Sequence, residues 1–302
     1  MELPVVVGVD GSQGSLQAVD WGAAEAERSG RTLRVVHASL WEHYEGVRPG
    51  ISADRPSEQV FAENLVAAAQ ERANRLAPGI EVSTDVRAEE PVSALLEEGT
   101  EAALLVLGPR GHGPIAGMLL GSVSLAVAAR AHCPVVVTRG EPSAGPPKRG
   151  RVVLGIGSTT GSTLAARFAF EQARSRGCEL VAVRAWSFPP YQNMPYPYVG
   201  GDQARTYRQQ AEETADRILG VVVGDYPEVA VERKLVAGTA HQMLLEEAVG
   251  TDLLVVGARR RHAAIGLQLG RVNHAMLHHA PCPVAVVPEW SGSPYPEHQE
   301  AT

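Results

Sequence analysis

The stretch that decides the fold runs from residue 104 to residue 124 and reads LLVLGPRGHGPIAGMLLGSVS. Its apolar start, 104–107, is typical of a strand that is buried on both faces of a sheet. Glycines follow, and after Gly121 a helical apolar spacing begins at Ser122. A strand, a glycine-rich loop and a helix N-terminus in this order predict a cradle for an anion such as phosphate.

The same arrangement occurs a second time along the chain. Residues 253–273 read LLVVGARRRHAAIGLQLGRVN, and the offsets 257 − 108 and 270 − 121 are both 149. Cys133-Pro134-Val135 returns at the same offset as Cys282-Pro283-Val284. Because the chain has 302 residues, about twice the size of a common domain, these matches predict a tandem duplication.

The segments between these landmarks predict the domain organisation. We expect domain 1 at residues 1–139, a linker at 140–150, domain 2 at 151–290 and a flexible tail at 291–302. The linker is rich in Pro and Gly, and the tail lacks apolar periodicity. Within each domain, short apolar runs alternate with segments of helical spacing, which predicts α/β domains with parallel sheets. We expect two tandem, doubly wound, five-stranded sheets with helices on both faces.

Composition narrows the functional classes. The formal charge is 27 − 34, or −7, which argues against general binding to nucleic acid and against docking on an anionic membrane. No apolar run approaches the 18 residues of a membrane helix, and the first residues lack the positively charged start of a signal peptide. The three cysteines form no CxxC pair, so we expect neither a disulfide framework nor a zinc site. These features predict a cytoplasmic protein.

The glycine loop differs from two common phosphate-binding loops. Gly108 and Gly113 have the gap of a Walker A loop, but Pro114 stands where its lysine belongs. The dinucleotide fingerprint follows the first strand of a sheet, and here the first strand leads into Asp10-Gly11-Ser12. The loop therefore belongs to another class of anion site.

With these residues identified, the chain resembles the universal stress protein family. The spacing Gly108-x2-Gly111-x9-Gly121-Ser122 is similar to the nucleotide-binding motif of that family. The opening Val7-Gly8-Val9-Asp10-Gly11-Ser12 and the closing His132-Cys133-Pro134-Val135 are also similar. The resemblance covers nearly the whole chain, twice, as in tandem members. It implies an adenine-nucleotide alpha-hydrolase-like fold with strand order 3-2-1-4-5, and ATP as the ligand with Mg²⁺ accompanying it.

The resemblance also implies individual roles. Asp10 would lie beside the adenosine, the three glycines would shape the phosphate loop, and Ser122 with the Val123 amide would hold phosphate oxygens. The candidate site of domain 1 is formed by Gly8, Asp10, Gly108, Arg110, Gly111, Gly113, Gly121, Ser122, Val123 and Ser124.

Several of these residues have an alternative interpretation. The glycine loop can be a mere surface connection, Asp10 can cap the following helix, and Arg110 can be a solvated loop charge. His112 could act as a general base, but the sequence shows no residue that would orient its imidazole. Cys133 and Cys282 are expected to pack as structural residues.

Domain 2 departs from the motif. Arg260 replaces the second glycine, Arg271 replaces the serine, and Gly157 replaces the aspartate. The arginines can clamp phosphate, fill the old cleft, or form a solvated basic loop. We therefore expect one tight nucleotide site per chain, and a weaker candidate site in domain 2 formed by Gly155, Gly257, Arg260 and Gly270.

Residues 186–198 of domain 2 contain an unusual concentration of aromatic side chains. Five aromatic side chains lie here among several prolines. One interpretation is a lid over a ligand or a surface for a protein partner, and the other is a loop that packs on its own domain. The five side chains are Trp186, Phe188, Tyr191, Tyr196 and Tyr198.

The favoured function is a non-catalytic, ATP-dependent regulator of a stress response. No pair of residues predicts an efficient hydrolytic centre, and no metal-ligand set of the protein's own is apparent. The alternatives are a slow ATPase or nucleotidyl-transfer enzyme on the same fold, and a ligand-free interaction scaffold. A homodimer of whole chains is a further expectation.

Overall fold

The protein is described by a computed structural model that covers residues 2–40, 57–111, 120–139, 150–157, 161–187, 201–258 and 269–289. The predicted tail, nearly all of the predicted linker and most of the aromatic segment lie outside these residues, as do His112, Gly113 and Arg260. The chain forms two compact units: the first comprises the described residues up to Thr138 together with those from Pro288, and the second runs from Arg139 to Val287.

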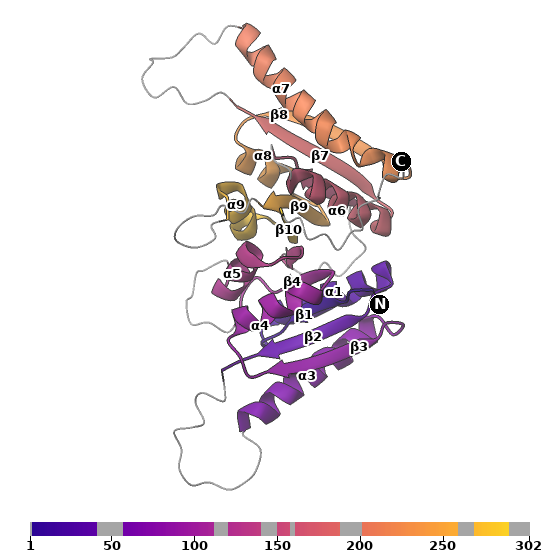
Figure 1. Ribbon diagram of the computed structural model, residues 1–302, viewed down its shortest axis with the longest axis vertical. Helices are drawn as coiled ribbons and strands as arrows, with labels where there is room; N and C mark the ends of the chain where they lie inside the picture. The colour runs from indigo at the N-terminus through magenta and orange to yellow at the C-terminus, as the bar shows by residue number, and fades with distance from the viewer. Residues whose placement is uncertain are drawn as a thin grey trace, which may run out of the picture. The chain divides into compact units, whose positions relative to one another are not determined.

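Strands and helices alternate in the first unit (Figure 1). In chain order they are β1 (Val5–Gly8), α1 (Gln13–Ser29), β2 (Leu33–Ala38), α3 (Ser57–Leu76), β3 (Val82–Arg87), α4 (Pro91–Glu98), β4 (Leu104–Leu107), α5 (Ser122–Arg130) and β5 (Val135–Val137). The strands are ordered β3-β2-β1-β4-β5, and each neighbouring pair is parallel. This order confirms the prediction of a doubly wound 3-2-1-4-5 sheet.

The second unit repeats the arrangement. Its elements are β6 (Arg151–Gly155), α6 (Gly161–Arg176), β7 (Glu179–Trp186), α7 (Gly201–Gly220), β8 (Val231–Ala237), α8 (Ala240–Glu247), β9 (Leu253–Ala258), α9 (Arg271–His279) and β10 (Val284–Pro288). Its strands are ordered β8-β7-β6-β9-β10, which is the same 3-2-1-4-5 topology.

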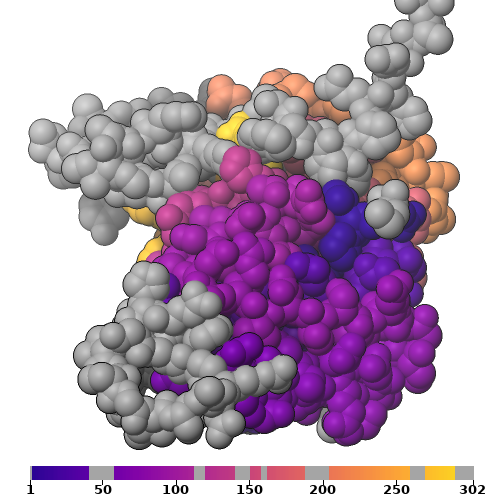
Figure 2. All heavy atoms as spheres, turned by 60° about the horizontal axis from the view of Figure 1, so that its bottom comes forward, coloured from indigo at the N-terminus to yellow at the C-terminus, as the bar shows by residue number. Residues whose placement is uncertain are grey.

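Side-chain alternation along β1 places helices on both faces of the first sheet. Val7 faces α1, where a Cβ atom on Gly22 would lie 2.5 Å from its Cγ2 atom. Gly8 faces α4, where its own Cβ would lie 3.0 Å from Leu95. Successive strand residues point to opposite faces, so α1 and α4 cover different sides of the sheet. The atoms of this unit form one continuous packed surface, drawn from indigo to magenta in Figure 2.

Local signals set the helix ends. Ser12 caps α1 by accepting a hydrogen bond from the Ser15 amide, and Gly30 ends the helix with a left-handed φ of 67°. Pro91 occupies the first turn of α4, as its sequence position predicts. Helix α5 ends at Arg130, because Ala131 already has non-helical dihedral angles, with φ −59° and ψ 149°.

The topology places a crevice at the carboxyl ends of β1 and β4. Strand β1 pairs with β2 on one side and with β4 on the other, so the chain order reverses between these neighbours. Ligands of open α/β sheets bind at such a reversal. Among the described residues, no helix is both long enough and apolar enough to cross a bilayer.

Candidate functional site

A pocket of about 480 Å³ lies at this crevice of the first half. All residues of the predicted first-half site that the structure describes line it, and Gly113 lies outside the described residues. The lining is Gly8, Val9, Asp10, Ser15, Val36, Ala38, Pro91, Leu95, Leu107, Gly108, Arg110, Gly111, Leu120, Gly121, Ser122, Val123 and Ser124.

The pocket has an apolar side and a polar side. Val36 and Ala38 from β2, with Pro91 and Leu95 from α4, line the apolar side. Residue Gly8 pairs with Val36, and β4 with its glycine loop lies on the other side of β1. Because neighbouring strands are about 4.8 Å apart, the two sides are separated by about 10 Å. This lining suits a ligand with a flat apolar part and an anionic part.

The polar side is built on the N-terminus of α5. Its N-cap is Gly121, with φ −76° and ψ 151°, and no side chain caps the helix. The amides of Ser122, Val123 and Ser124 occupy the first helical turn, where N–H groups have no partner within the helix. These donors and the positive end of the helix dipole favour an anion at this position.

The loop glycines are needed for close approach and not for unusual dihedral angles. A Cβ atom on Gly108 would lie 2.6 Å from the Gly14 carbonyl carbon, so the loop packs directly on the first turn of α1. A Cβ atom on Gly111 would collide with the Asp10 carboxylate. None of the three motif glycines has a positive φ, whereas Gly11 has a φ of 83° at the turn after β1. At these three positions, glycine therefore serves close packing.

Asp10 orients the start of α1 without capping it. Its Oδ1 atom accepts hydrogen bonds from the Ser12 amide at 3.0 Å and from the Ser12 hydroxyl at 2.6 Å. The Ser12 hydroxyl is also 3.0 Å from the Arg110 carbonyl oxygen. Ser12 therefore caps the helix, and the alternative role of Asp10 as the cap is wrong. A hydroxyl has one proton, so Ser12 donates either to Asp10 or to the glycine loop.

Ser124 uses its hydroxyl inside the protein. This side chain is buried and donates to the Gly108 carbonyl oxygen at 2.7 Å, which ties α5 to the end of β4. Its hydroxyl proton is thus engaged, and the backbone N–H is the donor that Ser124 presents to a ligand. By contrast, Ser122 and Arg110 are exposed at the mouth of the pocket.

Sequence reasoning missed two parts of the site. Val36, Ala38 and Leu95 follow ordinary core patterns, so nothing distinguishes them from other buried residues in the sequence. Ser12 contacts both Asp10, after β1, and the glycine loop at Arg110. Its position just before a helical spacing was the available signal for a helix cap.

Two cysteines behave alike in the two halves. Burial raises the pKa of Cys133 to about 12 and that of Cys282 to about 12. All three cysteines lie within the described residues and are free thiols. The high pKa values leave the two buried thiols protonated, in agreement with packing roles.

The second half keeps the scaffold of the site and changes its polar groups. Asn273 donates to the Gly257 carbonyl oxygen at 3.1 Å, so it repeats the contact that Ser124 makes in the first half. Gly270 caps α9 without a side-chain hydrogen bond, as Gly121 caps α5. A Cβ atom on Gly155 would lie 2.9 Å from Leu244, as Gly8 lies against Leu95.

The differences of the second half concern charge. Gly157 stands where the first half has Asp10, and exposed Arg271 begins α9 where the first half has Ser122. Arg260 lies outside the described residues. Within the part of the chain that is described, no three His, Cys, Asp or Glu side chains are placed to hold a metal ion.

The chain thus consists of two α/β units that each contain a parallel sheet, and the first has a glycine-lined pocket at its topological switch point. These features define the class of tandem, doubly wound α/β proteins. The sequence model of the universal stress protein family matches residues 2–139 and again residues 148–288. The chain belongs to the universal stress protein family, as a tandem two-domain member.

Three known proteins illustrate what this chain is similar to. A universal stress protein of Mycobacterium bovis is 35% identical over 294 residues, covering 93% of this chain and 96% of the relative. The crystal structure of a universal stress protein from Archaeoglobus fulgidus covers 95% of this chain and 98% of its own, with a TM-score of 0.69 and 18% identity. A universal stress protein solved in complex with cAMP covers 45% of this chain and 97% of its own, with 31% identity and a TM-score of 0.35.

Proposed function

We propose that the first half binds ATP together with Mg²⁺, and that the protein is a nucleotide-dependent regulator. One observation carries this proposal: the pocket places an apolar wall on one side of β1 and an uncapped helix N-terminus on the other. An adenine base suits the wall formed by Val36, Ala38 and Leu95. The phosphates then meet the amides of α5, with their favourable dipole.

Asp10 lies between these two parts, beside Gly111. Ser12 orients its carboxylate, and Asp10 lines the pocket. In this position the carboxylate can accept hydrogen bonds from ribose hydroxyls. A carboxylate close to phosphates also favours an accompanying cation that reduces their mutual repulsion. This position is the reason to expect Mg²⁺ with ATP.

The regulator is proposed to hold ATP without efficient turnover. Of the described residues that line the pocket, only Asp10 and Arg110 are ionisable, and Asp10 already accepts a hydrogen bond from the Ser12 amide and lies 2.6 Å from its hydroxyl. General-base catalysis needs a base aimed at an attacking water, usually with an orienting partner. Occupancy of the pocket, rather than hydrolysis, is then the signal that a partner reads.

The test is to identify the nucleotide that the purified chain carries. The protein is denatured, and the released small molecules are analysed by mass spectrometry. We expect an adenine nucleotide, predominantly ATP, close to one per chain. Calorimetry on nucleotide-stripped protein then measures ATP affinity, and phosphate release measures turnover. A stripped protein that binds no adenine nucleotide would overturn the proposal, and rapid phosphate release would favour the ATPase alternative.

A further inference from the structure

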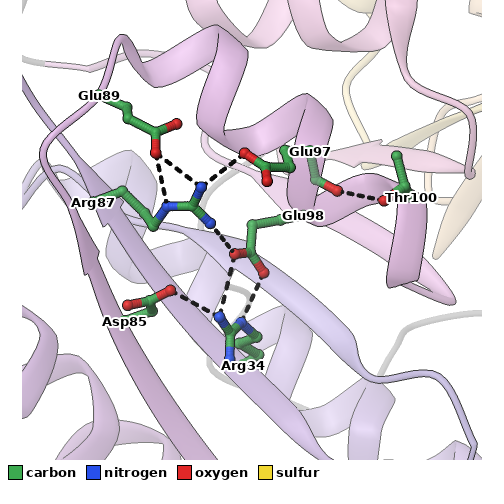
Figure 3. A network of polar contacts seen from close by, with 7 residues as sticks. All are labelled: Arg34, Asp85, Arg87, Glu89, Glu97, Glu98 and Thr100. Atoms are coloured by element: carbon green, nitrogen blue, oxygen red, sulfur yellow. Dashed lines mark hydrogen bonds and ion pairs between the residues drawn. The ribbon is translucent and has the colours of Figure 1, made fainter.

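A network of arginine and acidic side chains lies between α4, β2 and β3 (Figure 3). Glu98, near the C-terminal end of α4, accepts hydrogen bonds from Arg34 on β2 at 2.7 and 3.2 Å and from Arg87 on β3 at 2.9 Å. Figure 3 shows both guanidinium groups pointing toward this one carboxylate. The network therefore joins one helix to two strands.

Three more carboxylates complete the network. Arg34 contacts Asp85 at 2.7 Å, and Arg87 contacts Glu89 and Glu97 at 2.9 and 2.7 Å. Glu98 is the centre, because its side chain is only 9% exposed and both arginines contact it. An ion pair network of this kind, with bidentate arginine contacts, fixes geometry better than isolated surface pairs do.

The network is adjacent to the pocket through both elements that it joins. Arg34 precedes Val36 by two residues on β2, so both side chains lie on the face that α4 covers. Arg87 is the register partner of Ala38, the other wall residue of β2. On α4, Leu95 lines the pocket one turn before Glu98. A change in how α4 sits on β2 and β3 would therefore change the width of the apolar side.

The second half offers an internal comparison. The offsets 247 − 98 and 234 − 85 are both 149, so Glu247 corresponds to Glu98, and Lys234 corresponds to Asp85. There α8 is held by Lys234, whose amino group lies 2.9 Å from Glu247, and no arginine fork takes part in this contact. Among the described residues, the multidentate network thus belongs to the half whose motif is intact.

We propose that Arg34, Arg87 and Glu98 are positioning residues that set the width of the adenine end of the pocket by fixing α4 against β2 and β3. This inference rests on the proposed function of the first half. The three side chains do not line the pocket and act through Val36, Ala38 and Leu95. Their removal then weakens the contacts to the base, which AMP, ADP and ATP share, and leaves the phosphate contacts on α5 in place.

The test compares Glu98→Gln with a matched control, Asp20→Asn, in the full chain. Asp20 on α1 holds Arg72 on α3 through a bidentate pair at 2.5 and 2.7 Å, and neither residue lines the pocket. Calorimetry measures the affinities for AMP, ADP and ATP, and thermal unfolding measures stability. We expect Glu98→Gln to weaken all three nucleotides by the same factor, about three- to tenfold. Asp20→Asn should leave the three affinities unchanged.

Other results would overturn the inference. These are unchanged affinities in Glu98→Gln, a loss that grows with the number of phosphates, or an equal loss in Asp20→Asn. If Glu98→Gln does not fold, Arg34→Gln replaces it, since the Arg34 side chain is the more exposed of the two arginines and contacts two carboxylates where Arg87 contacts three. A wild-type chain that binds no adenine nucleotide would refute the proposed function itself, and this result is read before any variant is made.

Discussion

The two halves have the same strand order and differ where the first strand of each half meets the glycine loop. In the first half, the Asp10 carboxylate occupies the space where a side chain at position 111 would begin, so that position holds glycine. In the second half, Gly157 carries no carboxylate, and the position corresponding to Gly111 is Arg260. The two changes are compatible with each other, because the loss of the carboxylate removes the obstacle to a side chain.

This comparison teaches that the scaffold and the polar groups of the site are separable. The tie between helix and strand end is present in both halves, made by Ser124 in one and by Asn273 in the other. Both helix N-caps are glycines that leave the first amides uncapped by side chains. What differs is the charge at corresponding positions, with Gly157 in place of Asp10 and Arg271 in place of Ser122, so we expect the ligand preference to differ while the fold stays the same.

The largest effect is expected for Gly121→Glu. A Cβ atom there would meet only ordinary contacts, 3.6 Å or more away, so the variant should fold. Its carboxylate would lie where phosphates bind, and we expect ATP affinity to fall by about a hundredfold or more. Gly270→Glu is the matched control, because its Cβ has open space around it in the second half. Calorimetry showing equal losses in both variants would refute the assignment of the tight site.

A double-mutant cycle tests the coupling between Asp10 and Gly111. Asp10→Ala removes hydrogen bonds from a charged acceptor, and we expect a loss of ATP affinity of about tenfold or more. Gly111→Ala should also weaken binding, because the new methyl group displaces the carboxylate. The double variant should bind no more weakly than Asp10→Ala alone. Losses that multiply, measured by the same calorimetric titration, would show that the two positions act independently.

The shared helix ties allow a smaller and more symmetric test. Ser124→Ala and Asn273→Ala each remove a buried hydrogen bond, and each should lower the free energy of unfolding by about 1 kcal/mol. Urea denaturation measures this loss in both variants. Only Ser124→Ala should also weaken ATP binding, by a few-fold. If Asn273→Ala weakens binding as strongly, the second half contributes to the tight site.

The smallest expected effect concerns thiol reactivity, in which the two halves should agree. Cys133 and Cys282 have pKa values of about 12 because they are buried, so near pH 8 almost none of either thiol is ionised. The thiolate is the reactive form, and its fraction rises only as the pH approaches 12. We expect an alkylating reagent to modify partly exposed Cys178 first in the native protein. Rapid labelling of Cys133 but not Cys282 would reveal a less closed first half.

The sequence predicted the frame of the molecule well because its signals are local. The apolar run at 104–107 predicted β4 with the bounds observed, and the 149-residue offset paired the two glycine loops. The candidate residues of domain 1 that the structure describes gather around one pocket because the ends of β1 and β4 meet in a doubly wound sheet. A strand end and a glycine spacing are enough to predict that meeting.

Other features of the site depend on contacts between distant segments. Glu98 and Arg34 are 64 residues apart, and no local pattern indicates that they pair. The Ser124 hydroxyl turns toward Gly108, although a serine in the first turn of a helix is equally suited to face a ligand. The apolar wall was overlooked because Val36 and Leu95 have the pattern of any core residue. Such features need the tertiary arrangement itself.

The central claim is that one half of this chain holds a tight nucleotide site and the other does not. Equilibrium dialysis of the stripped full-length protein against ATP and Mg²⁺, near saturation of the tight site, tests it most directly. We predict a bound ratio close to one ATP per chain, which falls to near zero in Gly121→Glu and stays close to one in Arg260→Ala. A ratio close to two in the wild type, reduced to one by Arg260→Ala, would contradict the account and show that arginine has taken over phosphate binding in the second half.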